Sequence, residues 1–128
     1  MRLLLDTNAF LKWVDADRGL SRKARDTLAD PGNECLVSIA SAWEIAIKCG
    51  LGKLRLAVPA ARYVANNVVA NGFILLAIDI RHIARIETLT NHHRDPFDRL
   101  LIAQALVEDI PVVTADQIFR KYGVKRIW

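Results

Sequence analysis

The sequence predicts one α/β domain with a mostly parallel sheet of four or five strands. Short apolar runs of strand length alternate along the chain with longer segments of helical periodicity, the pattern of β–α units. The chain has 128 residues, of which 52% are hydrophobic, which fits a single domain spanning 1–128 with one sizeable core. Internal repeats, linkers and low-complexity segments are absent.

The N-terminal half is predicted to hold two strands and four helices. Ser21 is a typical helix N-cap, and the turn at 30–33 (Asp-Pro-Gly-Asn) ends the helix that it starts. Gly50 stops the next helix, Pro59 opens another, and Gly72 stops that one. The strands are 2–5 and 34–38; the helices are 7–14, 21–29, 40–49 and 59–71.

The C-terminal half continues the alternation. Asp79 is predicted to cap one helix, and Asp95 to cap another that has Pro96 at its first helical position. Pro111 precedes a short apolar strand. The strands are 73–78, 112–114 and 124–128; the helices are 79–87, 95–109 and a short one after the strand at 112–114.

The helix that begins DPFDRLLIAQAL carries a second carboxylate in its first turn. Asp98 falls at the third helical position, where a carboxylate accepts from free amides and meets the positive end of the helix dipole. It also shares a face with Leu101, Ile102 and Ala105, so it heads the face that is expected to pack. A carboxylate there needs a partner, a metal or a shifted pKa. The polar positions lie elsewhere around this helix: Arg99, Gln104 and Glu108.

Three further acids, Asp6, Glu44 and Asp116, are expected near Asp98. In open parallel sheets, sites form beyond the carboxyl ends of the strands. Glu44 lies in the first turns of the helix after the second strand, and that helix begins at the same edge of the sheet. The residues at or just past the predicted strand ends are Asp6, Ser38, Asp79 and Asp116.

Each of these acids also has a structural explanation. Asp6 and Asp116 follow strands, where a cap or turn is a common role. Glu44 matches a capping box with Ser41, and an i,i+4 ion pair with Lys48. The site interpretation therefore depends on the four acids together, because the α/β arrangement sends them to one edge of the sheet.

Four sequence segments, taken in order, resemble the PIN domain. They are DTN at 6–8, WEIAIK at 43–48, HHRDPFDRLLIAQA at 92–105 and VVTAD at 112–116. More narrowly, they resemble the VapC-type toxins of bacterial and archaeal toxin–antitoxin pairs, over essentially the whole chain. The resemblance implies a three-layer α/β/α fold and a Mg²⁺- or Mn²⁺-dependent endoribonuclease. It matches Asp95 to a position that we keep as a helix cap. It matches Asp6, Glu44, Asp98 and Asp116 to the acidic site, and Asn8 and Thr114 to polar positions beside it.

The chemistry of these residues agrees with a metal site. Four clustered carboxylates repel one another unless a cation is present, and hard oxygen donors without paired thiols favour Mg²⁺ or Mn²⁺ over Zn²⁺. We expect Asp6, Asp98 and Asp116 as metal ligands, with Glu44 as a ligand or as the group that orients water. His92 and His93 are adjacent, so a two-histidine metal site is not expected.

The charge distribution favours a polyanionic substrate. The net charge is +4, and without the four candidate acids the other side chains carry +8. A negative pit inside a positive surround suits metal ions in the pit and RNA outside it. Arg94 and Arg99 are candidates for phosphate contact, with ordinary surface charge as the alternative.

The resemblance also leads to expectations about protein partners, and the apolar runs of the sequence lead to one about location in the cell. The resemblance implies a small VapB-like antitoxin that covers the site, and a homodimer; apolar helices at 39–49 and 59–69 offer a groove. No apolar run is long enough to span a membrane and none resembles a signal peptide, so we expect a cytoplasmic protein. Cys35 and Cys49 are expected to be free thiols.

Three alternatives compete with the nuclease. A haloacid-dehalogenase-type phosphatase needs a second aspartate two residues after Asp6, where this chain has Asn8. A receiver-type signalling domain needs paired acids and a late lysine after a strand, and Lys121 and Lys125 are badly placed for that. A PIN-fold binding module that keeps its acids without catalysis is not distinguished by sequence.

Overall fold

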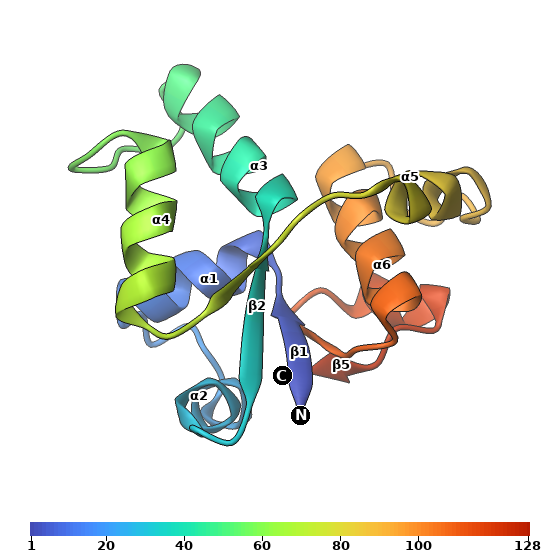
Figure 1. The fold of residues 1–128 in the computed structure, drawn as a ribbon, viewed down its shortest axis with the longest axis horizontal. Helices are drawn as coiled ribbons and strands as arrows, with labels where there is room; N and C mark the ends of the chain where they lie inside the picture. Colours follow the sequence, from blue (N-terminus) through green and yellow to red (C-terminus); the bar gives the residue numbers. More distant parts are fainter.

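A computed structural model covering residues 1–128 shows a parallel sheet of five strands between two layers of helices (Figure 1). The strand order is β3–β2–β1–β4–β5, with every neighbouring pair parallel. The predicted α/β class and three-layer architecture are confirmed. The strands are β1 (Arg2–Leu5), β2 (Glu34–Ser38), β3 (Ile74–Leu76), β4 (Val112–Val113) and β5 (Arg126–Ile127).

The helices begin and end close to the predicted signals. Ser21 accepts a hydrogen bond from the Ala24 amide, and Asp79 caps its helix through the Arg81 amide. Gly72, with φ of +65°, follows the fourth helix in the left-handed conformation that glycine tolerates. The helices are α1 (Thr7–Val14), α2 (Arg22–Ala29), α3 (Ile39–Gly50), α4 (Ala60–Ala70), α5 (Ile80–Glu87), α6 (Pro96–Glu108) and the 3₁₀ helix η1 (Gln117–Tyr122).

The two faces of the sheet have separate apolar cores. In β1, Leu3 and Leu5 belong to the core under α1, α2 and α4, whereas Leu4 belongs to the core under α6 and η1. This alternation follows from the two-residue period of a strand whose two faces are both covered. In Figure 1, α1, α2 and α4 lie on one side of the strands, and α5 and α6 on the other.

Two predictions differ in detail from the structure. The third strand, predicted at 73–78, spans only Ile74–Leu76, because it is an edge strand whose Ile74 and Leu75 stay 40% and 42% exposed. Gln104 was grouped with the polar positions outside the packed face of α6, but it is fully buried. The helix is covered nearly all round: Leu100, Leu101, Ile102, Ala103 and Ala105 are also buried.

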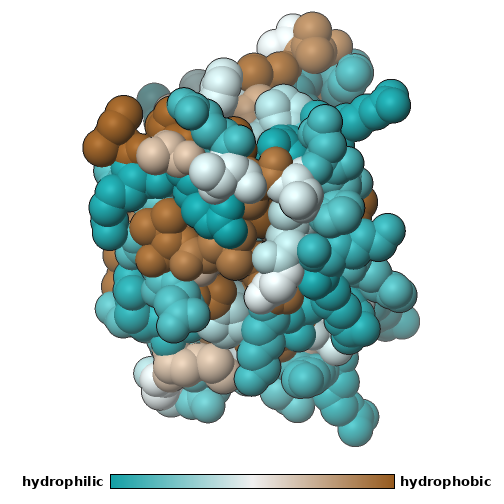
Figure 2. Space-filling view, turned by 90° about the vertical axis from the view of Figure 1, so that its right-hand side faces the viewer, coloured by the Kyte–Doolittle hydropathy of each residue, from teal (hydrophilic) through white to brown (hydrophobic).

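The surface is mixed in character. Figure 2 shows the side that carries α5 and α6, where hydrophilic side chains cover most of the face around a smaller hydrophobic area. Ile80 and Ile83 of α5 are among the exposed apolar side chains of the protein. Both cysteines are free thiols, as expected. None of the helices combines the length and the apolar character that a membrane crossing requires.

Candidate metal centre

Asp6 and Asp116 follow two neighbouring strands at the same edge of the sheet. β1 and β4 pair in parallel with Leu5 opposite Val113, so both chains leave the sheet side by side. The Asp6 amide donates to the Val113 carbonyl at 3.1 Å, and the Asp116 amide donates to Thr114 Oγ1 at 3.0 Å. Thr114 thus lies beside both acids, as predicted.

Asp6 has a structural role and also lies in the site. Its Oδ1 accepts from the Ala9 amide at 2.7 Å, which caps α1, yet the residue is only 7% exposed. Burial raises the pKa of Asp6, and the carboxylates of Glu44 and Asp116 raise it further, while hydrogen bonds from Thr114 and Ala9 act in the opposite direction. The α1 cap therefore holds this carboxylate among other acids.

Glu44 is fixed by α3, though not by the predicted capping box. Ser38 caps α3 through the Ala40 amide, and Ser41 is instead buried, where it accepts a 2.9 Å hydrogen bond from Thr7 Oγ1. This hydroxyl pair joins the first turns of α1 and α3 and so sets Glu44 beside Asp6. The Glu44–Lys48 ion pair was predicted correctly, with 2.8 Å between Oε2 and Nζ.

One carboxylate oxygen of Glu44 has no partner. Glu44 is 7% exposed, and its Oε1 is buried without a hydrogen bond. A buried, unpaired carboxylate oxygen is costly unless something else binds it. This unpaired oxygen is therefore suited to bind a cation or a water molecule.

Asp98 lies in the first turn of α6 with a strongly shifted titration. Asp95 caps the helix, accepting from the Phe97 and Asp98 amides at 2.9 and 3.2 Å, as expected. Burial, followed by the nearby Asp95 carboxylate, raises the pKa of Asp98 to about 6, while a hydrogen bond from His93 lowers it and Asp6 raises it further. The carboxylates of Glu44 and Asp116 raise the pKa of Asp6, and Asp6 raises that of Asp98, so the four predicted acids lie near one another at this edge of the sheet.

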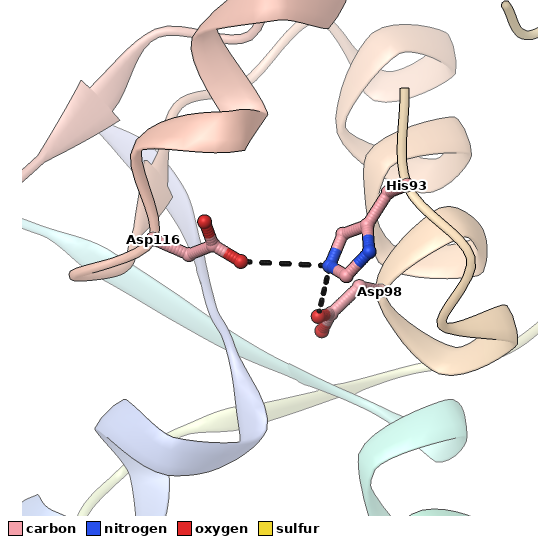
Figure 3. A group of neighbouring side chains, drawn as sticks. All are labelled: His93, Asp98 and Asp116. Carbon is pink, nitrogen blue, oxygen red and sulfur yellow. Dashed lines mark hydrogen bonds and ion pairs between the residues drawn. The ribbon is translucent and has the colours of Figure 1, made fainter. Parts of the chain in front are cut away.

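His93 belongs to this site, although the sequence interpretation did not assign it there. Its Nε2 lies 2.8 Å from Asp98 Oδ2 and 3.5 Å from Asp116 Oδ2, so the imidazole bridges two acids (Figure 3). The adjacent His92 instead packs its ring against Tyr122, with 5.1 Å between centroids. The two histidines point in different directions, as predicted, but the prediction treated them only as a possible pair and so missed His93 alone. The sequence did offer one indication, because His93 lies two residues before Asp95, the N-cap of α6.

Tyr122 anchors the segment that carries His93. The amides of His92 and His93 both donate to Tyr122 Oη, at 3.0 and 2.8 Å. Arg99 Nη1 donates to the same oxygen at 3.3 Å and to the Thr90 carbonyl at 3.1 Å. Arg99 therefore braces this loop; its proposed contact with phosphate stays a prediction.

Basic side chains line cavities on both sides of the acids. One cavity of about 250 Å³ is bordered by Asp6, Asn8, Asp116 and Lys12, among others. Another, of about 370 Å³, contains Glu44 together with Lys48, Lys53 and Arg94. Asn8 thus lies where it was predicted, and Lys12 is a basic residue at the site that the sequence interpretation did not single out.

The donor set suits a hard divalent cation. Single side-chain atoms of His93, Asp98 and Asp116 all lie within 4.8 Å of one another. Glu44 is outside this group, but its carboxylate is close enough to Asp6 to raise the pKa of Asp6. The metal donors in this group are the carboxylate oxygens of Asp98 and Asp116, since His93 Nε2 faces both of them as a hydrogen-bond partner. Oxygen donors without a thiolate favour Mg²⁺ or Mn²⁺. The residues present therefore fit the predicted metal.

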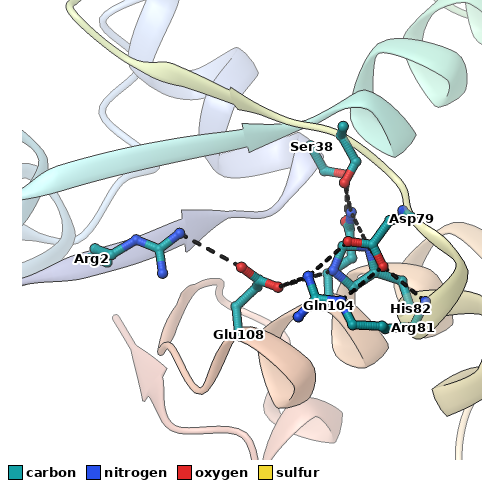
Figure 4. Close-up of polar contacts among 8 residues, drawn as sticks. Arg2, Ser38, Asp79, Arg81, His82, Gln104 and Glu108 are labelled. Atoms are coloured by element: carbon teal, nitrogen blue, oxygen red, sulfur yellow. Dashed lines mark hydrogen bonds and ion pairs between the residues drawn. The ribbon is translucent and has the colours of Figure 1, made fainter.

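Ser38 and Asp79 follow strands but do not join this cluster. Asp79 caps α5 and pairs with Arg81 at 2.8 Å, and Arg81 also contacts Glu108 in the last turn of α6. Asp98 lies ten residues earlier on that helix, about 15 Å away along its axis. Ser38 bonds Gln104 midway between them. Figure 4 shows this second polar cluster.

Comparison with known proteins agrees with this architecture. The family model of the PIN domain matches residues 3–125. The protein Ribonuclease VapC16 of Mycobacterium tuberculosis (strain ATCC 25618 / H37Rv) is 42% identical over 62 residues, which span 48% of this chain and 44% of that relative.

Solved structures extend the likeness in fold to the whole chain. The VapBC2 complex of Rickettsia felis, solved with a DNA fragment from its promoter, contains a chain that superposes with a TM-score of 0.67 at 13% identity over 100% of both chains. A chain of VapBC-1 from nontypeable Haemophilus influenzae gives 0.66 at 12% identity, covering 98% of this chain and 96% of that one. At these identities the likeness concerns the fold.

Proposed function

Because this chain belongs to the PIN domain family, we propose that it is a metal-dependent endoribonuclease and the toxin of a toxin–antitoxin pair. The partial match to Ribonuclease VapC16 supports the ribonuclease assignment. The observation that carries the proposal is the group of four neighbouring carboxylates, in which the buried Glu44 has one oxygen without a hydrogen bond and burial raises the pKa of Asp98 to about 6. Carboxylates with perturbed pKa values cluster at functional sites, which supports this assignment.

The proposed roles follow from the positions of the side chains. Asp6, Asp98 and Asp116 would hold Mg²⁺ or Mn²⁺, and Glu44 would bind it or orient water. When bound, the cation makes water more acidic and neutralises charge on a phosphate. Lys48 fixes Glu44 Oε2, which leaves Oε1 able to accept a hydrogen bond from an attacking water. No side-chain nucleophile is required.

The RNA backbone is proposed to lie across the two cavities beside the acids. Arg94 is exposed on the loop before α6 and borders one cavity, and Lys12 borders the other. Both are placed to contact phosphates that flank the scissile bond. Asn8, exposed beside Asp6, would add a neutral polar contact.

A VapB-like antitoxin is the proposed protein partner. Solved relatives in fold include VapBC complexes. Exposed Trp43, Ile47 and Leu51 follow one another along α3 next to the acids, and the Trp43 ring meets Phe97 at 4.9 Å. A partner helix that covers this stripe would also cover the site. The homodimer stays part of the proposal.

The main alternative is a PIN-fold module that binds RNA or metal without cleavage. The experiment that separates the two uses purified, antitoxin-free protein and total cellular RNA, with Mg²⁺, Mn²⁺ or chelator, beside Asp98→Asn. We expect cuts at discrete positions that require both the metal and Asp98. Metal binding without any cleavage would favour the binding module, and cleavage that survives Asp98→Asn in a folded protein would refute the proposed site.

A further inference from the structure

We propose that His93 competes with the divalent cation for Asp98 and Asp116, so that its imidazole sets how tightly this site binds metal. The inference rests on the proposed function, because it assumes that these acids bind a divalent cation. It starts from the position of Nε2 between the two carboxylates, at 2.8 and 3.5 Å. Figure 3 shows the imidazole between the two carboxylates, so a cation that bound both of them would have to displace it.

The hydrogen bonds of the ring indicate that Nε2 is a donor. His93 Nδ1 accepts from the Asp95 amide at 3.4 Å, so in the neutral ring the proton is on Nε2. An Nε2–H group donates to Asp98 Oδ2 and has no lone pair to offer a metal. The geometry therefore indicates that the imidazole moves away from Asp98 when a cation binds and does not itself coordinate the cation.

The ring can leave without rebuilding the loop. The loop is held by its backbone, through the His92 and His93 amides on Tyr122 Oη, and that anchor does not involve the imidazole. The His93 side chain keeps 20% of its surface exposed, which gives it a path to solvent. Rotation about the side-chain bonds of His93 would free Asp98 Oδ2 for a cation, and it would break only one further contact, that of Nδ1 with the Asp95 amide at 3.4 Å.

The test is a direct titration of the metal-free full chain with Mn²⁺ and with Mg²⁺ by calorimetry. Deleting a hydrogen bond to a charged group should make His93→Ala bind both ions at least roughly tenfold more tightly. His93→Gln, which keeps an N–H donor at a similar reach, should stay closer to the unmodified protein. His92→Ala is the matched control, since its ring contacts Tyr122 and not the acids.

A spectroscopic measurement on the unmodified protein does not depend on the variants. Pulsed electron paramagnetic resonance of bound Mn²⁺ should show no ¹⁴N coupling from a coordinated imidazole. Such a coupling, or weaker Mn²⁺ binding by His93→Ala, would make His93 a ligand and overturn the inference. Equal affinities of His93→Ala and the unmodified protein, or His93→Gln binding as tightly as His93→Ala, would overturn it as well.

The failures of the two proposals are distinguishable. Unmodified protein that binds neither ion would refute both the metal site and the role of His93. Normal metal binding and cleavage by a His93→Ala protein with unchanged affinity would refute only the role of His93.

Discussion

The two ends of α6 carry polar clusters that differ in how their charges are matched. At its first turn, Asp98 lies among Asp6, Glu44 and Asp116, and burial raises the pKa of Asp98 to about 6. At its last turn, Glu108 meets His82 and Arg81, at 3.2 Å each, and Arg2 at 3.7 Å (Figure 4). The same helix thus has an acid-rich end and a balanced end.

In the balanced cluster, the acids that have a structural role are each paired with basic side chains. The Arg81 guanidinium hydrogen-bonds Asp79 and lowers its pKa to about 2. His82 is fully buried but satisfied, with Nδ1 accepting from the Asp79 amide and Nε2 facing Glu108. Compared with this cluster, the surplus of carboxylates at the other end of α6 is not a general feature of the chain, and it supports the proposed cation site.

The largest effect is expected from a substitution in the acid-rich end of α6. Asp6→Asn should lower metal affinity by at least tenfold and RNA cleavage by roughly 100-fold or more, because the carboxylate central to the cluster loses its charge. Asparagine is as good an N-cap as aspartate, so α1 should be retained. Calorimetry and a cleavage assay measure the two losses. Asp26→Asn on the exposed part of α2 is the control, and full cleavage by folded Asp6→Asn would contradict the site.

The next largest effect is expected from a substitution in the balanced end of α6. Glu108→Ala removes the carboxylate that His82, Arg81 and Arg2 share, so we expect the free energy of unfolding to fall by about 2 kcal/mol. Urea unfolding measures it, with the exposed Glu87→Ala as a matched control that should cost less than about 0.5 kcal/mol. Metal affinity should not change. A loss of metal binding in Glu108→Ala would show that the two ends are coupled.

The third prediction compares the two ends by their pH dependence. The pKa of Asp98 rises from 3.8 to about 6, so between these values the folded protein holds a proton that the unfolded chain has released, and stability falls as pH rises through this window. In metal-free protein, Asp98→Asn should therefore be more stable than the unmodified chain by about 1–2 kcal/mol at pH 7.5, after allowing for the partial exposure of Asp98. The difference should vanish near pH 3.5. Thermal unfolding with chelator at both pH values measures it, and an equal or lower stability at pH 7.5 would contradict the raised pKa.

The smallest effect concerns the rim of the acid-rich end. In an Asp98→Asn background, which prevents cleavage, Arg94→Ala should weaken RNA binding a few-fold and reduce the slope of log affinity against log salt by about one. Fluorescence anisotropy at several salt concentrations measures both. Arg22→Ala, on exposed α2, should leave the slope unchanged; equal effects of the two variants would mean that Arg94 contributes only general charge.

Most of the fold was predictable from the sequence because caps and strand ends are local signals. Asp79, Asp95 and Ser21 each cap the helix that was predicted for them. The third strand was predicted too long because an apolar run does not reveal that its strand lies at a sheet edge, where side chains stay exposed. Gln104 was misplaced for a related reason, since its burial depends on Ser38 and α5 and not on the helix itself.

The acid cluster was predictable in part. The rule for parallel sheets places Asp6 and Asp116 together, and the structure agrees. The same rule also selected Asp79, which lies three residues after β3 but caps α5 and pairs with Arg81 beside Glu108, at the other end of α6. His93 could not be found from spacing, because its position depends on the anchoring of two backbone amides by Tyr122, thirty residues away in sequence.

The sheet order has a consequence for the folding of the protein. β1 lies at the centre of the sheet and pairs with β4, so that Leu4 and its partner Val112 are 108 positions apart in the sequence. Asp6 and Asp116 therefore come together only when this long-range strand pairing forms. Pairings between distant segments are slow to form, so a partly folded chain that already has its local helices still lacks the complete acid cluster.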